Sequence, residues 1–168
     1  MTKNDDYIMP EAVKRDFVRL PGGGVYKLSV LEKYFMAGYL DFGKESGCAG
    51  FSAMDRLSAG KKLGDDFERG EVGKVRTTDV SKIRVDGGGG DSEPERVCFH
   101  QDRYFKACAA VPAEFWGIIR RVCVENKPLN AEGSRLDVKR ELYRQRIDLC
   151  RGLDRLIGFY IKSAKNNT

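Results

Sequence analysis

Basic side chains gather where the last long helical pattern of the chain, 139–162, begins. This pattern follows another helical segment, 112–126, and a connector at 127–136 that we predict to be tight. Two helices joined by a short turn are the geometry of a helix-turn-helix. There the second helix places its first residues against base edges while neighbouring arginines hold phosphates. The sequence therefore predicts contacts with double-stranded DNA from Arg135, Lys139, Arg140 and Arg144. It also predicts contacts with the DNA backbone from Arg120 and Arg121.

The same segment also carries acids, and this leaves a second interpretation open. Asp137, Glu141, Asp148 and Asp154 are interspersed with the arginines, at separations of three or four residues. Such pairs stabilise an isolated helix by only about 0.2–0.5 kcal/mol and are typical of a solvated face. The alternative is therefore a helical protein-interaction module that docks on RNA polymerase or a phage assembly partner without binding DNA specifically.

Charge favours a polyanion-binding function for the C-terminal part. The chain of 168 residues has a net charge of +5. Residues 101–168 hold 14 Lys or Arg and 8 Asp or Glu, a net of +6, so the preceding residues are close to neutral. A basic segment of this kind suits nucleic acid, although neutral-function domains also carry such a charge.

Residues that could support catalysis or metal binding do not form a recognisable site. His100 is the only histidine, and the five cysteines include no C-x-x-C pair, so we predict reduced thiols, no metal and no cofactor. Gly38, Gly43 and Lys44 match the phosphate-loop spacing, but Glu45 stands where Ser or Thr would ligate magnesium. We interpret that stretch as a helix end closed by glycine and predict that the protein is not an enzyme.

Apolar periodicity predicts an all-α fold of about five helices, with a Gly-rich loop in the middle and the helix-turn-helix at the C-terminal end. Ser29 with Glu32, and Ser52 with Asp55, predict capped helices over 28–40 and 51–70. Gly60 inside the second predicts a kink or a close packing contact. Further helices are expected at 101–111, 112–126 and from 134 to about 162. The organisation that we predict is an irregular arm (1–25), an N-terminal helical segment (26–85), a flexible acidic loop (86–96) and a basic core (97–168).

Two stretches resemble a domain found mostly in alphaproteobacterial proteins. "AGKKLGDDFERGEVGKVRTTD" (59–79) resembles its opening, and "RRVCVENKPL" with "LCRGLDRLIGFYI" resembles its close, so the likeness covers about 58–161. The family includes the C-terminal region of the transcriptional activator of gene transfer agents and phage-derived regulators, and its helices resemble the helix-turn-helix of sigma-factor region four. The resemblance implies promoter or operator DNA as ligand and RNA polymerase as a partner.

This sequence departs from the family pattern at two places. Many members have W-P-x-[RS] at the start of the last helix, where this chain has "SRLDVKRE" (134–141), and many have histidine before the closing tyrosine, where this chain has Phe159. The first departure falls where bases would be contacted, so it bears on the DNA sequence read. No apolar run approaches the roughly 20 residues of a membrane span, and the N-terminus is polar, so we expect a cytoplasmic protein.

Overall fold

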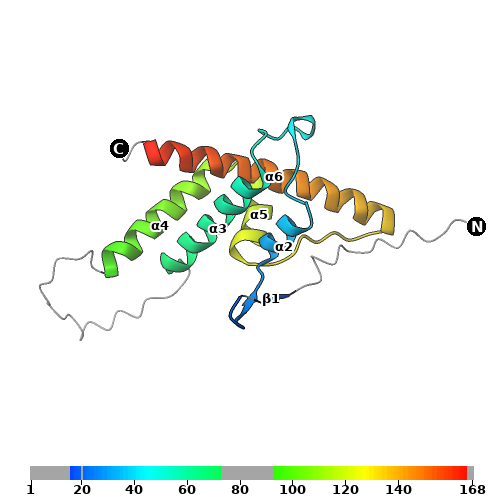
Figure 1. Ribbon diagram of the computed structural model, residues 1–168. Coiled ribbons are helices and arrows are strands. Elements are labelled where there is room, and N and C mark those ends of the chain that lie inside the picture. The colour runs from blue at the N-terminus through cyan, green and yellow to red at the C-terminus, as the bar shows by residue number, and fades with distance from the viewer. Residues whose placement is uncertain (1–15, 20, 73–92, 166–168) are drawn as a thin grey trace, which may run out of the picture.

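Helix α6 (Arg135–Lys165) runs along one side of the molecule, and three of the other helices pack against it (Figure 1). The computed structural model describes residues 16–19, 21–72 and 93–165. Helices α3 (Ala53–Arg69) and α4 (Glu93–Ala110) lie side by side and run away from α6. The fold is all-α, as predicted, apart from one small sheet.

Two capping boxes begin the first two helices at the predicted residues. In α2 (Val30–Met36) the Ser29 hydroxyl accepts from the Glu32 amide, and the Glu32 carboxylate accepts from the Ser29 amide at 2.8 Å. Ser52 and Asp55 make the same reciprocal pair at the start of α3. Each box satisfies two amides that have no partner within the helix, so a local sequence signal sets both boundaries.

Helix α4 begins earlier than the sequence pattern indicates. The flexible loop predicted over 86–96 is wrong for its last four residues, because α4 starts at Glu93. Pro94 lies in the first turn, where a helix does not need the missing amide. Residues 86–92 of that loop, and residues 73–85 of the predicted N-terminal helical segment, lie outside the described residues.

The N-terminal arm is partly ordered into a hairpin. Strands β1 (Phe17–Arg19) and β2 (Val25–Lys27) pair antiparallel, with Val18 opposite Tyr26. The prediction of an irregular arm over 1–25 is therefore wrong for residues 17–19 and 25. The glycines at 22 and 23 have positive φ, which allows the chain to reverse between the strands.

One hydrophobic cluster joins the two parts of the chain that the sequence separates. Leu31, Leu40 and Leu63 come from the N-terminal part, and they share this core with Leu149 and Leu153 of α6. Helix α5 (Ala113–Ile119) continues into a π turn, η3 (Arg120–Val124), and closes the cluster through the buried side chains of that segment. The N-terminal helices therefore pack into the C-terminal core.

Glycines let α3 approach the π turn closely. A side chain at Gly60 would meet Leu31, Cys123 and Leu153, which confirms the predicted close contact. A Cβ atom at Gly64 would lie 2.8 Å from the carbonyl oxygen of Cys123. Both positions are thus restricted to glycine by a neighbouring element.

Candidate nucleic-acid interface

The first half of α6 projects beyond the core. The buried residues of this helix run from Leu149 to Tyr160, and none of residues 135–148 is buried. Figure 1 shows this half extending past α2 and α5, with the connector and the segment after α2 beside it. The core face predicted to include Leu142 and Ile147 is therefore only partly covered there, because the other helices end before it.

Side chains from the N-terminal part hold the projecting half in place. The Arg146 guanidinium lies 3.6 Å from the centre of the Tyr39 ring, and Tyr143 meets Phe42 edge-on at 5.6 Å. Cation–π contacts of this kind contribute about 0.5–2 kcal/mol, depending on exposure. The segment after α2 therefore contacts the part of the projecting half that lies nearest the body of the protein.

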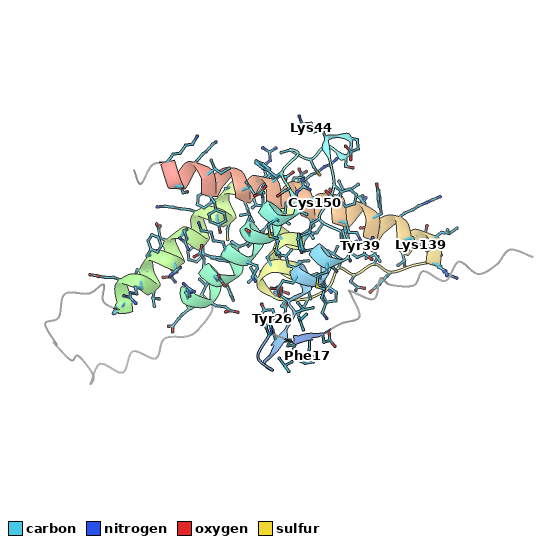
Figure 2. The ribbon with its side chains drawn as sticks, viewed as in Figure 1. Phe17, Tyr26, Tyr39, Lys44, Lys139 and Cys150 are labelled. Carbon is cyan, nitrogen blue, oxygen red and sulfur yellow. The ribbon has the colours of Figure 1, made fainter. Side chains whose placement is uncertain are left out.

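The predicted DNA contacts on α6 fall on two faces of the projecting half. At 100° per residue, Arg140 and Arg144 lie on one face, while Arg135 and Lys139 lie about 140° away. Arg140 is exposed, and Arg144 is 72% exposed although it pairs with Glu141 at 2.9 Å. Figure 2 shows Lys139 at the projecting end of the helix. The four residues thus all lie on the projecting half of α6, which carries positive charge on two faces.

The two remaining predicted contacts have partners within the protein. Arg120 pairs with Glu125 at 3.0 Å, and Arg121 donates to the carbonyl oxygen of Pro128 at 2.6 Å. The pKa of Glu125 is lowered, mainly by its hydrogen bond from Lys127. Arg121 therefore fixes the path of the connector, whereas Arg120 remains 60% exposed on the π turn.

The connector between α5 and α6 is open, whereas the sequence predicts a tight one. It spans 125–134, ten residues, against the three or four of a helix-turn-helix turn. Its extended chain is tied to α2: Leu129 donates to the Tyr34 hydroxyl at 2.7 Å, and Asn126 accepts from the Val30 amide at 2.7 Å. The prediction of a tight connector at 127–136 is wrong, because α2 offers polar partners that hold an open one.

A buried ion pair positions the loop that flanks α6. Arg56 and Asp154 face each other with N–O distances of 2.7 and 3.0 Å, and both side chains are almost inaccessible. Arg56 also donates to the carbonyl oxygens of Leu40 and Phe42, and Asp154 accepts from the Ala49 amide. This network corrects the sequence interpretation, which placed Asp154 on the solvated face of the last helix.

A second polar cluster joins α3 to α4. Asp66 is fully buried and accepts from Arg103, with one N–O distance of 2.7 Å, and it lies 2.8 Å from Nδ1 of His100. The carboxylate of Asp66 raises the pKa of Arg103. Tyr160 reaches the same region from α6, and its buried hydroxyl has no hydrogen-bond partner in the described part of the chain. An Asp–His pair can orient a catalytic base, but Cys98 stands two residues from His100 on α4, where helical side chains do not face each other.

The phosphate-loop-like stretch binds its own carboxylate. The amide of Gly43 donates to Glu45 at 3.0 Å, and Lys44 begins a short 3-10 turn, η1 (Lys44–Ser46). Glu45 thus occupies the position next to the glycine amide that a phosphate would need. Among residues 16–19, 21–72 and 93–165, no group of three potential metal-ligating side chains is found, and no helix there is long and apolar enough to span a bilayer.

Sequence reasoning missed the buried roles of Arg56, Asp66 and Asp154, although α3 carries a signal for Arg56. Arg56 stands at helical spacing from Gly60 and Leu63, and both of those residues are buried. A charged residue within an apolar face predicts a buried partner, since an unpaired charge would be too costly there. No family model, curated protein or solved structure matches this chain.

Proposed function

We propose that this protein is a small, non-catalytic DNA-binding transcriptional regulator of phage or phage-like origin, which places the projecting half of α6 in the major groove. One observation carries the proposal: residues 135–148 extend beyond the core, with basic side chains on two faces. The resemblance of 58–161 to phage-derived regulators supports the biological role. RNA polymerase is the protein partner that the same resemblance implies.

The dimensions of the projecting half suit a groove. Fourteen residues form about 21 Å of helix at 1.5 Å per residue. The major groove of B-DNA is about 12 Å wide and admits an α-helix, with a row of phosphates on each wall. A rod with cations on two faces can approach both walls at once. Arg140 and Arg144 would then face one wall while Arg135 and Lys139 face the other.

The ten-residue connector makes this a departure from the helix-turn-helix geometry. In that motif the first helix crosses the DNA backbone next to the recognition helix. Here a long connector anchored on α2 separates α5 from the start of α6, so α6 would enter the groove without a neighbouring helix on the DNA backbone. Arg120 would reach the backbone only from the π turn, and Arg121 would act through the connector that it holds.

The test is binding of the purified protein to duplex fragments from its own gene neighbourhood, with random-sequence competitor at about 150 mM salt. We expect one fragment to be preferred, and Arg140→Gln with Arg144→Gln to weaken that binding at least about ten-fold. The matched control is Arg96→Gln with Lys106→Gln, which removes the same charge from exposed positions on α4. Equal affinities of the α6 variant and the parent would contradict the proposal.

The second candidate is a protein-interaction module, and the ion pairs on α6 favour it. Arg144 pairs with Glu141, and Arg151 lies 3.5 Å from Asp148, so part of the surface is a mosaic of both signs. Such mosaics steer and fix protein partners. Binding of purified RNA polymerase by the parent but not by the Arg140/Arg144 variant, together with no fragment preference, would support this candidate instead.

A further inference from the structure

A second series of basic residues follows the whole of α6 on the side opposite the core. The spacing of the series is four, seven, four, seven and three residues, which keeps it within a stripe about 80° wide at 100° per residue. Leu149, Leu153 and Tyr160, which are buried, lie on the other side of the helix. We call this series the basic ridge, and its members are Arg140, Arg144, Arg151, Arg155, Lys162 and Lys165.

The ends of the ridge are accessible, and no exposed acid lies on the second half of α6. In the middle of the ridge, Arg151 and Arg155 line a hollow between residues 47–49 and α5, which Glu114 also lines. All members are exposed except Arg151, whose side chain is 40% exposed. Within 149–165 the single acid is Asp154, which is buried against Arg56. In the described part of the chain no carboxylate lies within 4.0 Å of Arg155 or Lys162. The exposed charge of this half of the helix is therefore all positive.

The loop that contains η1 places a further positive charge, Lys44, on the side of α6 that carries the ridge. Arg151 donates to the carbonyl oxygen of Ser46 at 2.7 Å, which fixes the η1 turn against the helix. Figure 2 shows Lys44, in that turn, on the side of α6 away from α3 and α4. Gly158, between the second and third basic groups, has nothing within 4 Å of the position of a Cβ atom, so no side chain obstructs an approach there.

The basic groups of the ridge recur at about the mean spacing of the backbone strands along a duplex, where the unequal grooves make the separate intervals alternately shorter and longer. The ridge is about 38 Å long, and its basic groups at 140/144, 151/155 and 162/165 recur about every 16 Å. A line drawn parallel to the axis of B-DNA crosses two backbone strands in each turn of about 34 Å, an average of one every 17 Å. A straight duplex that lies along the ridge can contact all three basic groups, whereas a duplex that crosses the ridge would contact fewer of them.

We propose that the basic ridge binds the phosphate backbone of a nucleic-acid duplex laid along α6, over about one helical turn and without regard to sequence. The inference rests on the proposed function for its ligand, but it concerns a separate binding mode. The projecting half of α6 would read a particular site, whereas the ridge would hold non-specific duplex during the search for that site. It also assigns DNA contacts to Arg151, Arg155, Lys162 and Lys165.

The test removes the far end of the ridge and measures non-specific binding. We expect Arg155→Gln with Lys162→Gln to lower the affinity for a random-sequence 20-base-pair duplex at about 50 mM salt by at least about ten-fold. The slope of log affinity against log salt should fall by about 1.8, since each lost phosphate contact contributes about 0.9. The Arg96→Gln, Lys106→Gln control should leave the slope unchanged.

A length series tests the geometry. Duplexes of 6 to 16 base pairs should show a salt slope that grows up to about 11 base pairs, the length of the ridge at 3.4 Å per pair, and is constant beyond it. An equal or higher affinity for a single strand of the same length would overturn the duplex geometry. A double-stranded RNA series shows whether the ridge distinguishes the two duplexes, and a preference for RNA would overturn the B-DNA spacing argument.

The outcomes separate this inference from the proposed function. A preferred gene fragment combined with an unchanged salt slope for the Arg155/Lys162 variant would overturn the ridge and leave the proposed function standing. A reduced slope without any fragment preference would support the ridge and contradict site-specific reading. No binding of any duplex at about 50 mM salt would overturn both.

Discussion

Replacing Arg56 with methionine should destabilise the fold more than any surface change on α6. The substitution introduces an unbranched apolar side chain and removes the partner of Asp154, which is itself buried. Asp154 would retain only the Ala49 amide, and the carbonyl oxygens of Leu40 and Phe42 would each lose a donor. The protein would thus hold an uncompensated buried charge and two unsatisfied acceptors.

The structure sets the size of this effect. Removing one partner of a buried, hydrogen-bonded ion pair costs about 3–5 kcal/mol, because the other charge cannot be rehydrated. Total stability of a domain is about 5–15 kcal/mol, so the variant should lose a large fraction of it. Replacing both members, with Arg56→Met and Asp154→Leu, should recover much of the loss, since no charge is then left in the core.

Urea unfolding followed by circular dichroism at pH 7 measures the difference. The matched control is Arg155→Met, which changes the next residue of α6 at an exposed position and should leave the midpoint unchanged. A loss below about 1 kcal/mol for Arg56→Met would refute the reasoning, because it would mean that water reaches Asp154 in the folded protein.

Three further outcomes follow from the packing and the thiols. Gly64→Ala should destabilise the folded protein by about 1–3 kcal/mol, because its Cβ would lie 2.8 Å from the carbonyl oxygen of Cys123. Gly158→Ala should stabilise it by about 0.5–1 kcal/mol, because nothing lies within 4 Å of that Cβ position. Thermal unfolding compares the two variants, and a similar effect at both sites would contradict the close approach at Gly64. Burial raises the pKa of the Cys150 thiol from 9.0 to about 12, so the folded state keeps a proton that the unfolded state releases. The stabilisation that this retained proton contributes is present below pH 9 and declines as pH rises from 9 toward 12. Urea unfolding midpoints of the reduced parent protein should therefore fall more steeply over this pH range than those of Cys150→Ala. Equal slopes of midpoint against pH for the two proteins would contradict the prediction. Iodoacetamide should modify the exposed Cys98 before the buried Cys48 and Cys150, as peptide mass mapping would show; uniform labelling of the native protein would contradict their burial.

The helices were predictable where a local signal defines them. The capping boxes at Ser29 and Ser52 fix helix starts within a few residues, and the apolar spacing in α6 identifies Leu149, Leu153 and Tyr160 as core. The hairpin was not predictable, because three-residue strands give too short an alternation to recognise. The early start of α4 was hidden by the adjoining glycines and by Pro94.

The candidate site was predictable in composition but only partly in geometry. Arg140 and Arg144 were found because charge type is visible in the sequence. The open path of the connector was not predictable, since it depends on partners in α2 about 95 residues away, such as Tyr34. Asp154 was mistaken for a surface acid for the same reason: its partner, Arg56, is 98 residues distant, and no local pattern reports a contact between them.

The shared core has a consequence for how the chain could be divided. Residues 16–72 and 93–165 each supply one side of the same hydrophobic cluster, and the Arg56–Asp154 and Asp66–Arg103 pairs also cross between them. Neither fragment can bury its apolar face alone, so each should remain largely unfolded by itself. Two fragments produced by a cut between 73 and 92 should fold together when they are mixed. Helix α6 would then belong to the C-terminal fragment but become ordered only when the N-terminal fragment packs against it.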